Sequence, residues 1–201
     1  MKIGLIGYPL SGKTTVFNTL TGLHARVDSF ITSGKEANVG LIKVPDKRLD
    51  ALSEIYQPKK ITHAEISFVD LAGITSTSGG GFDTNTLTLM RQVEAFTYVV
   101  RDFAGEAVSH PLGRIDPAGD ISGLDQEMEL ADLIVIEKRQ SRLEKEGRKG
   151  SPEYNLLERC REALENSTPL RETGLSKDEL RALSGFGFLS LKPRLILLNT
   201  G

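Results

Sequence analysis

Residues 7–14 constrain the fold of this chain more than any other part of its sequence. They match the pattern G-x-x-x-x-G-K-[ST] in full and read Gly7-Tyr8-Pro9-Leu10-Ser11-Gly12-Lys13-Thr14. Glycines in this pattern let the backbone turn so that its N–H groups point inward and form a nest for an anion. The lysine places a cation on the β- and γ-phosphates of a nucleotide, and the final hydroxyl reaches Mg²⁺.

The flanking sequence is the one that such a phosphate loop requires. An apolar run over residues 3–6 predicts a buried strand before the loop, and residues 13–20 have the spacing of a helix after it. That helix adds its positive N-terminus to the site. A glycine-rich turn that matches by chance is the alternative, and the strand, loop and helix order argues against it. The predicted phosphate-binding residues are Gly7, Pro9, Leu10, Ser11, Gly12, Lys13, Thr14 and Thr15.

A second motif places Asp70 at the end of an apolar strand, with Gly73 three residues later. In P-loop switch proteins such an aspartate holds Mg²⁺, and the glycine N–H contacts the γ-phosphate. An aspartate after a strand is otherwise a common turn residue. The spacing of one βαβ unit after the phosphate loop favours the metal role. We therefore predict that Thr14 and Asp70 hold Mg²⁺ and that Gly73 contacts the phosphate.

The order of the predicted elements indicates an α/β fold of the G-domain-like P-loop NTPase type. Helical patterns alternate with apolar strands, which are predicted over residues 3–6, 39–44, 64–70, 96–100 and 193–198. Such alternation predicts a mostly parallel sheet with helices on both faces. Asp46 is placed to cap one helix, whose apolar positions are Leu49, Leu52 and Ile55.

The composition changes near residue 115, and a helical insertion is expected there. Helix formers fill residues 124–149, and Ser151 follows in a tight turn where it can cap a second helix. Two helices joined so closely are expected to form an antiparallel, coiled-coil-like hairpin. We expect a nucleotide-binding domain over residues 1–115, completed by a strand at 190–201, with the hairpin inserted at 116–189.

Composition excludes several other classes of site. The formal net charge of −2 gives the whole chain no electrostatic attraction for nucleic acid or an anionic membrane. No apolar run approaches the roughly 20 residues that span a bilayer. The single cysteine, Cys160, rules out an internal disulfide and fits a reducing cytoplasm. The three histidines have no metal-ligand spacing and are interpreted as structural or solvated; they are His24, His63 and His110.

These features together resemble the YchF/Obg-like ATPase family of translation-factor-related P-loop NTPases. The resemblance covers nearly the whole chain and rests on the phosphate loop and on further short segments. These are Asn38-Val39-Gly40, Val44-Pro45-Asp46-Lys47-Arg48-Leu49, Pro58-Lys59-Lys60, Phe68-Val69-Asp70-Leu71-Ala72-Gly73, Val99-Val100-Arg101 and Leu191-Lys192-Pro193. The resemblance implies a nucleotide domain with an inserted helical hairpin, using Mg²⁺ and ATP or GTP as a regulatory switch linked to translation.

The resemblance also implies a base-binding loop at Asn199 and Thr200, read as N-x-x-E in the family, which favours adenine. The sequence ends at Gly201, before the fourth residue of that loop, and it contains no counterpart of the family's C-terminal TGS-type module. The choice between ATP and GTP therefore stays open. The family carries a threonine in its first switch segment, and the nearest hydroxyl side chains in this sequence are those of Thr32 and Ser33. In the second switch segment, Ile74 stands where Ras-like enzymes have a glutamine that orients water.

Two departures from the family pattern affect the expected activity. Leu10 and Ser11 replace an asparagine and a valine, and that asparagine is linked to monovalent-cation assistance, so potassium stimulation is not expected. Ile74 cannot orient a water molecule, so hydrolysis should be slow and should depend on positioning and electrostatics. A nucleotide-binding module or pseudoenzyme with negligible turnover is the alternative.

By family analogy the tip of the hairpin contacts the ribosome or RNA. The basic residues there are Lys138, Arg139, Arg142, Lys145, Arg148 and Lys149. Glu137, Glu144 and Glu146 dilute this charge, so an ordinary solvated helix face is the alternative interpretation.

Overall fold

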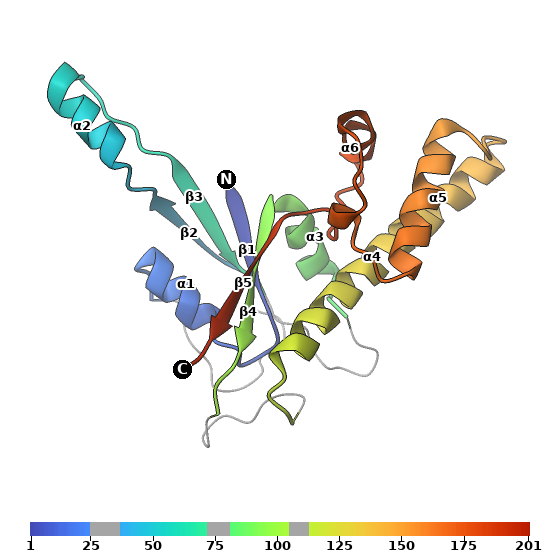
Figure 1. The fold of residues 1–201 in the computed structure, drawn as a ribbon, viewed down its shortest axis with the longest axis horizontal. Coiled ribbons are helices and arrows are strands. Elements are labelled where there is room, and N and C mark those ends of the chain that lie inside the picture. The colour runs from blue at the N-terminus through green and yellow to red at the C-terminus, as the bar shows by residue number, and fades with distance from the viewer. Residues whose placement is uncertain (25–36, 72–80, 105–112) are drawn as a thin grey trace.

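A five-stranded sheet organises the computed structural model, which describes residues 1–24, 37–71, 81–104 and 113–201. The strand order is β2-β3-β1-β4-β5 (Figure 1). The strands are β1 (Lys2–Ile6), β2 (Asn38–Lys43), β3 (Glu65–Asp70), β4 (Ala95–Arg101) and β5 (Arg194–Asn199). All neighbouring pairs are parallel except β2 and β3, which are antiparallel. The predicted mostly parallel sheet is confirmed.

Helices cover both faces of the sheet because successive residues of a strand point to opposite sides. On one face, Leu5 of β1 packs in a cluster with Phe17 of α1 (Lys13–Thr21). On the other, Ile6 packs in a cluster with Met90 of α3 (Thr84–Gln92) and Met128 of α4 (Pro117–Lys145). All five side chains are fully buried. The central strand β1 therefore carries the phosphate loop at the most enclosed position in the sheet.

The predicted caps form where the sequence places them. The Asp46 carboxylate accepts a hydrogen bond from the backbone N–H of Arg48 at the start of α2 (Lys47–Tyr56). The Ser151 hydroxyl accepts one from Tyr154 N–H at the start of α5 (Pro152–Glu165). Each cap satisfies a backbone donor that the first helical turn leaves without a partner.

Helix α2 differs from the other helices in what its apolar positions do. It lies at the end of an arm that continues β2 and β3 away from the sheet (Figure 1). None of its residues is buried, and Leu52 and Ile55 are 51% and 72% exposed. The helix forms as the sequence predicts. Its apolar residues nevertheless pack into no hydrophobic core among the described residues, and these are Leu49, Leu52 and Ile55. Periodicity identifies an apolar face and does not identify what covers it.

The predicted hairpin is formed by α4 and α5, and it has a hydrophobic core of its own. Its buried members include Ile136, Leu143, Leu157, Cys160 and Leu164. The earlier part of α4 packs instead on the sheet, through Leu124, Met128 and Ala131. One helix therefore serves two cores. The division of the chain into residues 1–115 with 190–201, and 116–189, remains a proposal, and α4 links its two parts.

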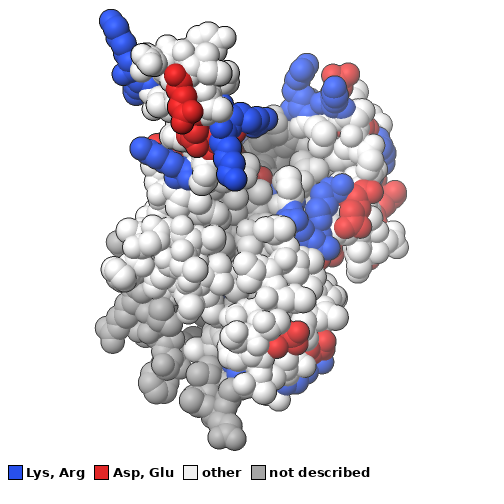
Figure 2. Space-filling view, turned by 60° about the vertical axis from the view of Figure 1, so that its left-hand side comes forward, with Lys and Arg blue, Asp and Glu red and all other residues white. Residues whose placement is uncertain are grey.

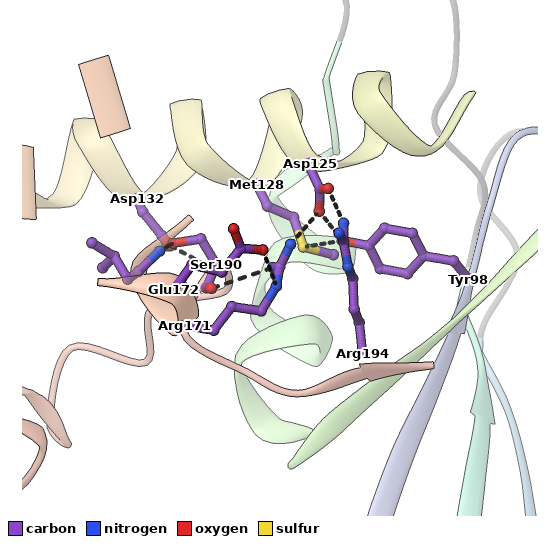
Figure 3. A network of polar contacts seen from close by, with 9 residues as sticks. Tyr98, Asp125, Met128, Asp132, Arg171, Glu172, Ser190 and Arg194 are labelled. Atoms are coloured by element: carbon purple, nitrogen blue, oxygen red, sulfur yellow. Dashed lines mark hydrogen bonds and ion pairs between the residues drawn. The ribbon is translucent and has the colours of Figure 1, made fainter. Parts of the chain in front are cut away.

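A polar network joins α4 to the sheet where β5 begins (Figure 3). The Asp125 carboxylate of α4 accepts hydrogen bonds from the Tyr98 hydroxyl at 2.7 Å, from Arg171 at 3.0 Å and from Arg194. Arg171 belongs to the short helix η1 (Leu170–Glu172). About two turns further along α4, Asp132 accepts from the backbone N–H groups of Leu189 and Ser190, both at 2.8 Å. These contacts fix the path of the chain into β5.

The remaining described helix, α6 (Lys177–Leu183), begins with a capping box between Ser176 and Glu179. Across the part of the chain that the structure describes, no helix combines the length and apolar character that a bilayer crossing would need.

Candidate functional site

The phosphate loop connects β1 to α1 at the carboxyl edge of the parallel strands. A Cβ atom at Gly7 would overlap the backbone carbonyl oxygen of Val99, so no side chain fits there. Gly12 precedes α1 with φ 94°, and Leu10 also has a positive φ, 64°. Left-handed backbone costs little only for glycine. The loop is thus held in a strained, close-packed path that the two motif glycines make possible.

Lys13 is buried and lies back across the loop. Its Nζ donates hydrogen bonds to the carbonyl oxygens of Tyr8 at 2.8 Å and Gly7 at 3.1 Å. Burial lowers the pKa of Lys13 to about 8, and the Asp70 carboxylate opposes that shift. The ammonium group therefore lacks a full counter-charge. An anion at the loop would supply one.

Thr14 and Asp70 lie together at the metal position that the sequence predicts. Asp70 is opposite Leu5 in the parallel pairing of β3 and β1, which brings the end of β3 beside the start of α1. The Thr14 hydroxyl donates to Asp70 Oδ2 at 2.8 Å, and Asn38 Nδ2 lies 3.3 Å from the same oxygen. The predicted contact between the two segments is present.

This donor set fits Mg²⁺. A hydroxyl and a carboxylate are hard oxygen ligands, and Mg²⁺ commonly binds one or two carboxylates while it takes its remaining ligands from water and phosphate. No cluster of three or more His, Cys, Asp or Glu side chains suited to a metal occurs among the described residues. A cation held here would take its remaining ligands from water and from the phosphates of a bound nucleotide.

Asn199 joins the end of β5 to the phosphate loop. Its side-chain Nδ2 donates to the carbonyl oxygen of Ser11 at 3.0 Å, and its Oδ1 accepts from Gly201 N–H at 3.4 Å. A Cβ at Gly12 would overlap that same Nδ2, so the second motif glycine also makes room for Asn199. Thr200 is exposed. Of the two residues predicted to contact the base, only Asn199 is hydrogen-bonded to the phosphate loop.

The other predicted site residues have less definite places. Thr15 is exposed on the first turn of α1, and Pro9 is half-buried in the loop. The remaining predicted site residues lie outside the described residues, and these are Thr32, Ser33, Gly73 and Ile74.

Arg101 and Phe103 lie beside the Asn199 loop and are functional candidates that the sequence analysis missed. Arg101 pairs with Asn199 in the register of β4 and β5, and its side chain is almost fully buried. Its guanidinium donates to the Phe103 carbonyl at 3.1 Å and lies 4.4 Å from the centre of the Phe103 ring. A Cβ at Gly201 would lie 3.4 Å from Phe103 Cβ. The sequence feature that could have identified Arg101 is its position at the end of an apolar strand. A charge buried there requires nearby hydrogen-bond acceptors.

Tyr8 is a third residue that the sequence analysis missed, and it connects the phosphate loop to α4. A Cβ at Gly123 of α4 would overlap the Tyr8 hydroxyl, so the helix approaches the loop closely at that glycine. Burial raises the pKa of Tyr8, and the carboxylates of Asp120 and Glu127 raise it further, so the hydroxyl stays neutral. Close approach of the helix at Gly123 is the kind of contact that a glycine in a helix permits.

Comparison with known proteins places this geometry in a family. The sequence profile described as "50S ribosome-binding GTPase" matches residues 2–145. The chain is 39% identical to the ribosome-binding ATPase YchF of Haemophilus ducreyi and 36% identical to that of Escherichia coli O157:H7. Each alignment covers 98% of this chain and 56% of the relative, so the chain spans about half the length of these curated relatives.

A solved structure, that of the YchF GTPase from Schizosaccharomyces pombe, matches the fold with a TM-score of 0.79 at 28% identity. The match covers 100% of this chain and 57% of the yeast chain. The chain belongs to the family of 50S ribosome-binding GTPases, and the curated relatives and the solved structure that it resembles are YchF proteins.

Proposed function

We propose that this chain binds a purine nucleoside triphosphate together with Mg²⁺ at the β1–α1 loop and hydrolyses it slowly. One observation carries the proposal. A buried, under-neutralised lysine and a Thr14–Asp70 hydrogen bond of 2.8 Å lie at the same loop. A cation and two hard-oxygen donors at one loop support the binding of phosphates and Mg²⁺ there. The names of the relatives, ribosome-binding ATPase and YchF GTPase, support the same activity class.

Each residue has a distinct task in this proposal. The backbone N–H groups of the loop and Lys13 bind the phosphates, and Thr14 and Asp70 hold the metal. Mg²⁺ would neutralise charge on the phosphate oxygens. Ile74 follows Gly73 in the sequence and carries no group that could orient a water molecule. Turnover would therefore depend on positioning and electrostatics, which is the reason to expect a slow rate.

The base would lie against Asn199 and Thr200, with the Phe103 ring nearby as apolar surface. Arg101 holds that ring in place through its carbonyl hydrogen bond and its cation–π contact. The relatives from Haemophilus ducreyi and Escherichia coli are named ATPases. We therefore place ATP before GTP as the physiological nucleotide.

The partner proposed for the switch is the ribosome, contacted through the tip of the α4–α5 hairpin in the cytoplasm. The names of the relatives support this partner. The positive charge at the hairpin tip supports ribosome binding less than the number of basic residues in the sequence suggests. Four of its six basic side chains are in ion pairs, namely Arg139, Arg142, Arg148 and Lys149. Figure 2 views the molecule from its α2 side, and on that face basic and acidic side chains are also interspersed, with no large patch of one sign. Shape and specific contacts would have to supply more of the affinity than net charge.

Nucleotide binding and product formation, measured on wild type and Lys13→Ala, test the proposal. Lys2→Ala is a matched control, because Lys2 lies at the opposite end of β1. We expect saturable Mg²⁺-dependent ATP binding with slow release of phosphate in wild type and in Lys2→Ala, and strongly weakened binding and product formation in Lys13→Ala. Binding without product would identify the chain as a nucleotide-binding module with negligible turnover. Equal binding by wild type and folded Lys13→Ala would reject the site.

A further inference from the structure

Asn38 lies at the proposed metal site although it is not one of the two predicted metal ligands. It is the first residue of β2, and the antiparallel register of β2 and β3 sets it directly opposite Asp70. In an antiparallel pair the first residue of one strand meets the last residue of the other. The reversed direction of β2 is therefore what brings the start of this strand to the carboxyl edge of the sheet, where the phosphate loop lies.

The Asp70 carboxylate is held from two sides. Thr14 Oγ1 of α1 donates to Oδ2 at 2.8 Å, and Asn38 Nδ2 of β2 donates to the same Oδ2 at 3.3 Å. Asp70 itself is 8% exposed. Both of these donors use Oδ2, and no described residue donates a hydrogen bond to Oδ1. A carboxylate has acceptor capacity on both oxygens, so Oδ1 is the oxygen that we expect to face a cation or its water.

We infer that Asn38 is a positioning residue of the magnesium site, holding the Asp70 carboxylate in the orientation that binds the hydrated metal. The inference rests on the proposed function, and it deepens it by assigning a role to a residue outside the two phosphate motifs.

An amide suits this task better than a charged donor. Asn38 is neutral at every pH that the protein meets, so it orients the carboxylate without cancelling its negative charge. A lysine in the same place would offset the charge that attracts Mg²⁺. Partners that hold metal ligands in this way typically change metal affinity by about 10–100-fold when they are removed. The 3.3 Å separation indicates a weak hydrogen bond, so the lower end of that range is expected.

The competing interpretation is that the Asn38–Asp70 contact only stabilises the sheet at its β2 side. The two interpretations differ in what they alter. A positioning residue changes the affinity for Mg²⁺ and leaves metal-free nucleotide binding unchanged, since the loop and Lys13 bind the phosphates directly. A purely structural residue changes both together or neither.

The experiment titrates Mg²⁺ into the protein with a fluorescent ATP analogue and measures analogue affinity separately in EDTA. The variants are Asn38→Ala and Asn38→Leu, the second of which keeps the branched shape of asparagine without a donor. Lys43→Ala is the control, because Lys43 lies at the other end of β2, opposite Glu65. We expect the half-saturating Mg²⁺ concentration to rise about tenfold in both Asn38 variants. Affinity in EDTA and the behaviour of Lys43→Ala should match wild type.

Three results would overturn the inference. One is a half-saturating Mg²⁺ concentration within twofold of wild type in either folded Asn38 variant. Another is an equal loss of affinity with and without Mg²⁺. The third is loss of the fold in both variants, shown by thermal unfolding, which would assign Asn38 a structural role. Failure of the proposed function is visible separately, because wild type itself would then bind the analogue with no dependence on Mg²⁺.

Discussion

The two ends of the proposed nucleotide site are built very differently. At the phosphate end, Lys13 is buried against loop carbonyls, and Thr14 and Asp70 are hydrogen-bonded across two elements. At the base end, Thr200 is exposed and Asn199 reaches the loop through one amide hydrogen bond. Buried groups with charge contribute more to binding than exposed ones. Most of the affinity should therefore come from the phosphates and the metal, which all nucleoside triphosphates share.

The largest effect is expected from removing the cation at the phosphate end. Lys13→Ala should weaken triphosphate binding about 100-fold, since a hydrogen bond to a charged group contributes up to about 3 kcal/mol. Calorimetric titration of both proteins measures the change, and thermal unfolding checks that the variant is folded. Equal affinities would mean that the two ends of the site do not differ as described.

Metal binding should respond next most strongly. Asp70→Ala removes the carboxylate that accepts from Thr14, and we expect the half-saturating Mg²⁺ concentration to rise on the order of 30-fold. Affinity for nucleotide in EDTA should change much less, because Lys13 is still present. If the Mg²⁺ requirement of Asp70→Ala equals that of wild type, the metal is held elsewhere.

The phosphate end should also impose a pH dependence. Burial lowers the pKa of Lys13 to about 8 in the free protein, and bound phosphates would raise it. Affinity should therefore be full below pH 8 and fall about tenfold per pH unit above it, since binding then takes up a proton. Titrations between pH 7 and 9.5 at constant free Mg²⁺ measure this slope.

The control for this pH dependence is Lys13→Arg, whose guanidinium stays charged throughout the range. Its residual affinity should be independent of pH. The titration of Lys13 does not destabilise the fold in this range. Between pH 8 and 10.5 the unfolded chain binds more protons at Lys13 than the folded one, so that group makes the fold more stable as pH rises. A slope that persists in Lys13→Arg would assign the titration to another group.

The contrast between the two ends also explains how far the sequence could predict the site. Phosphate binding uses contiguous residues with a fixed geometry, so residues 7–14 identify the loop directly. The meeting of Thr14 and Asp70 follows from the rule that parallel strands end at one edge of a sheet. The hydrogen bond between them shows that the two side chains meet, and their role as metal ligands stays a prediction.

Contacts between distant segments could not be predicted in the same way. Tyr8 against Gly123, and Asn38 opposite Asp70, depend on the path of α4 and on the reversed direction of β2. Neither path is encoded in a local pattern. The same limit appears in α2, where the cap at Asp46 and the helix are confirmed but the apolar residues stay exposed. Local sequence specifies the element, and tertiary packing decides what the element contacts.

A substitution of Ser11 tests whether every buried polar group at the phosphate end contributes to nucleotide binding. Its hydroxyl is buried and forms no hydrogen bond with any described residue. Within the loop, the hydroxyl lies close to Gly7. Ser11→Val should raise the free energy of unfolding by about 1 kcal/mol, because an unsatisfied buried group is removed. Nucleotide affinity should be unchanged, since the Ser11 carbonyl still accepts from Asn199.

Ser190→Val is the matched control for Ser11→Val. Ser190 is equally buried, but its hydroxyl accepts a hydrogen bond from Leu170 N–H. This substitution should lower the free energy of unfolding, opposite in sign to Ser11→Val. Chemical denaturation of the two variants measures both changes. Destabilisation by Ser11→Val would show that the hydroxyl has a partner, such as a buried water, and that the loop needs it.

The smallest effect is expected at the base end, in the choice between ATP and GTP. Asn199 uses one Nδ2 hydrogen for the Ser11 carbonyl and its Oδ1 for Gly201 N–H, which leaves one Nδ2 hydrogen for the base. That donor can meet N7, an acceptor that adenine and guanine both carry, whereas the two bases differ at their 6-substituents. Thr200 is exposed and short, and the Phe103 ring offers a surface that either purine could pack on. The affinities of this 201-residue chain for ATP and GTP should therefore lie within about tenfold of each other, or about 1.4 kcal/mol.

Competition titrations against a fluorescent nucleotide measure the ratio of the two affinities, and Asn199→Ala should weaken the binding of both nucleotides alike. A preference beyond about a hundredfold would mean that side chains other than Asn199 and Thr200 read the 6-substituent, and that the base end contributes as much to recognition as the phosphate end.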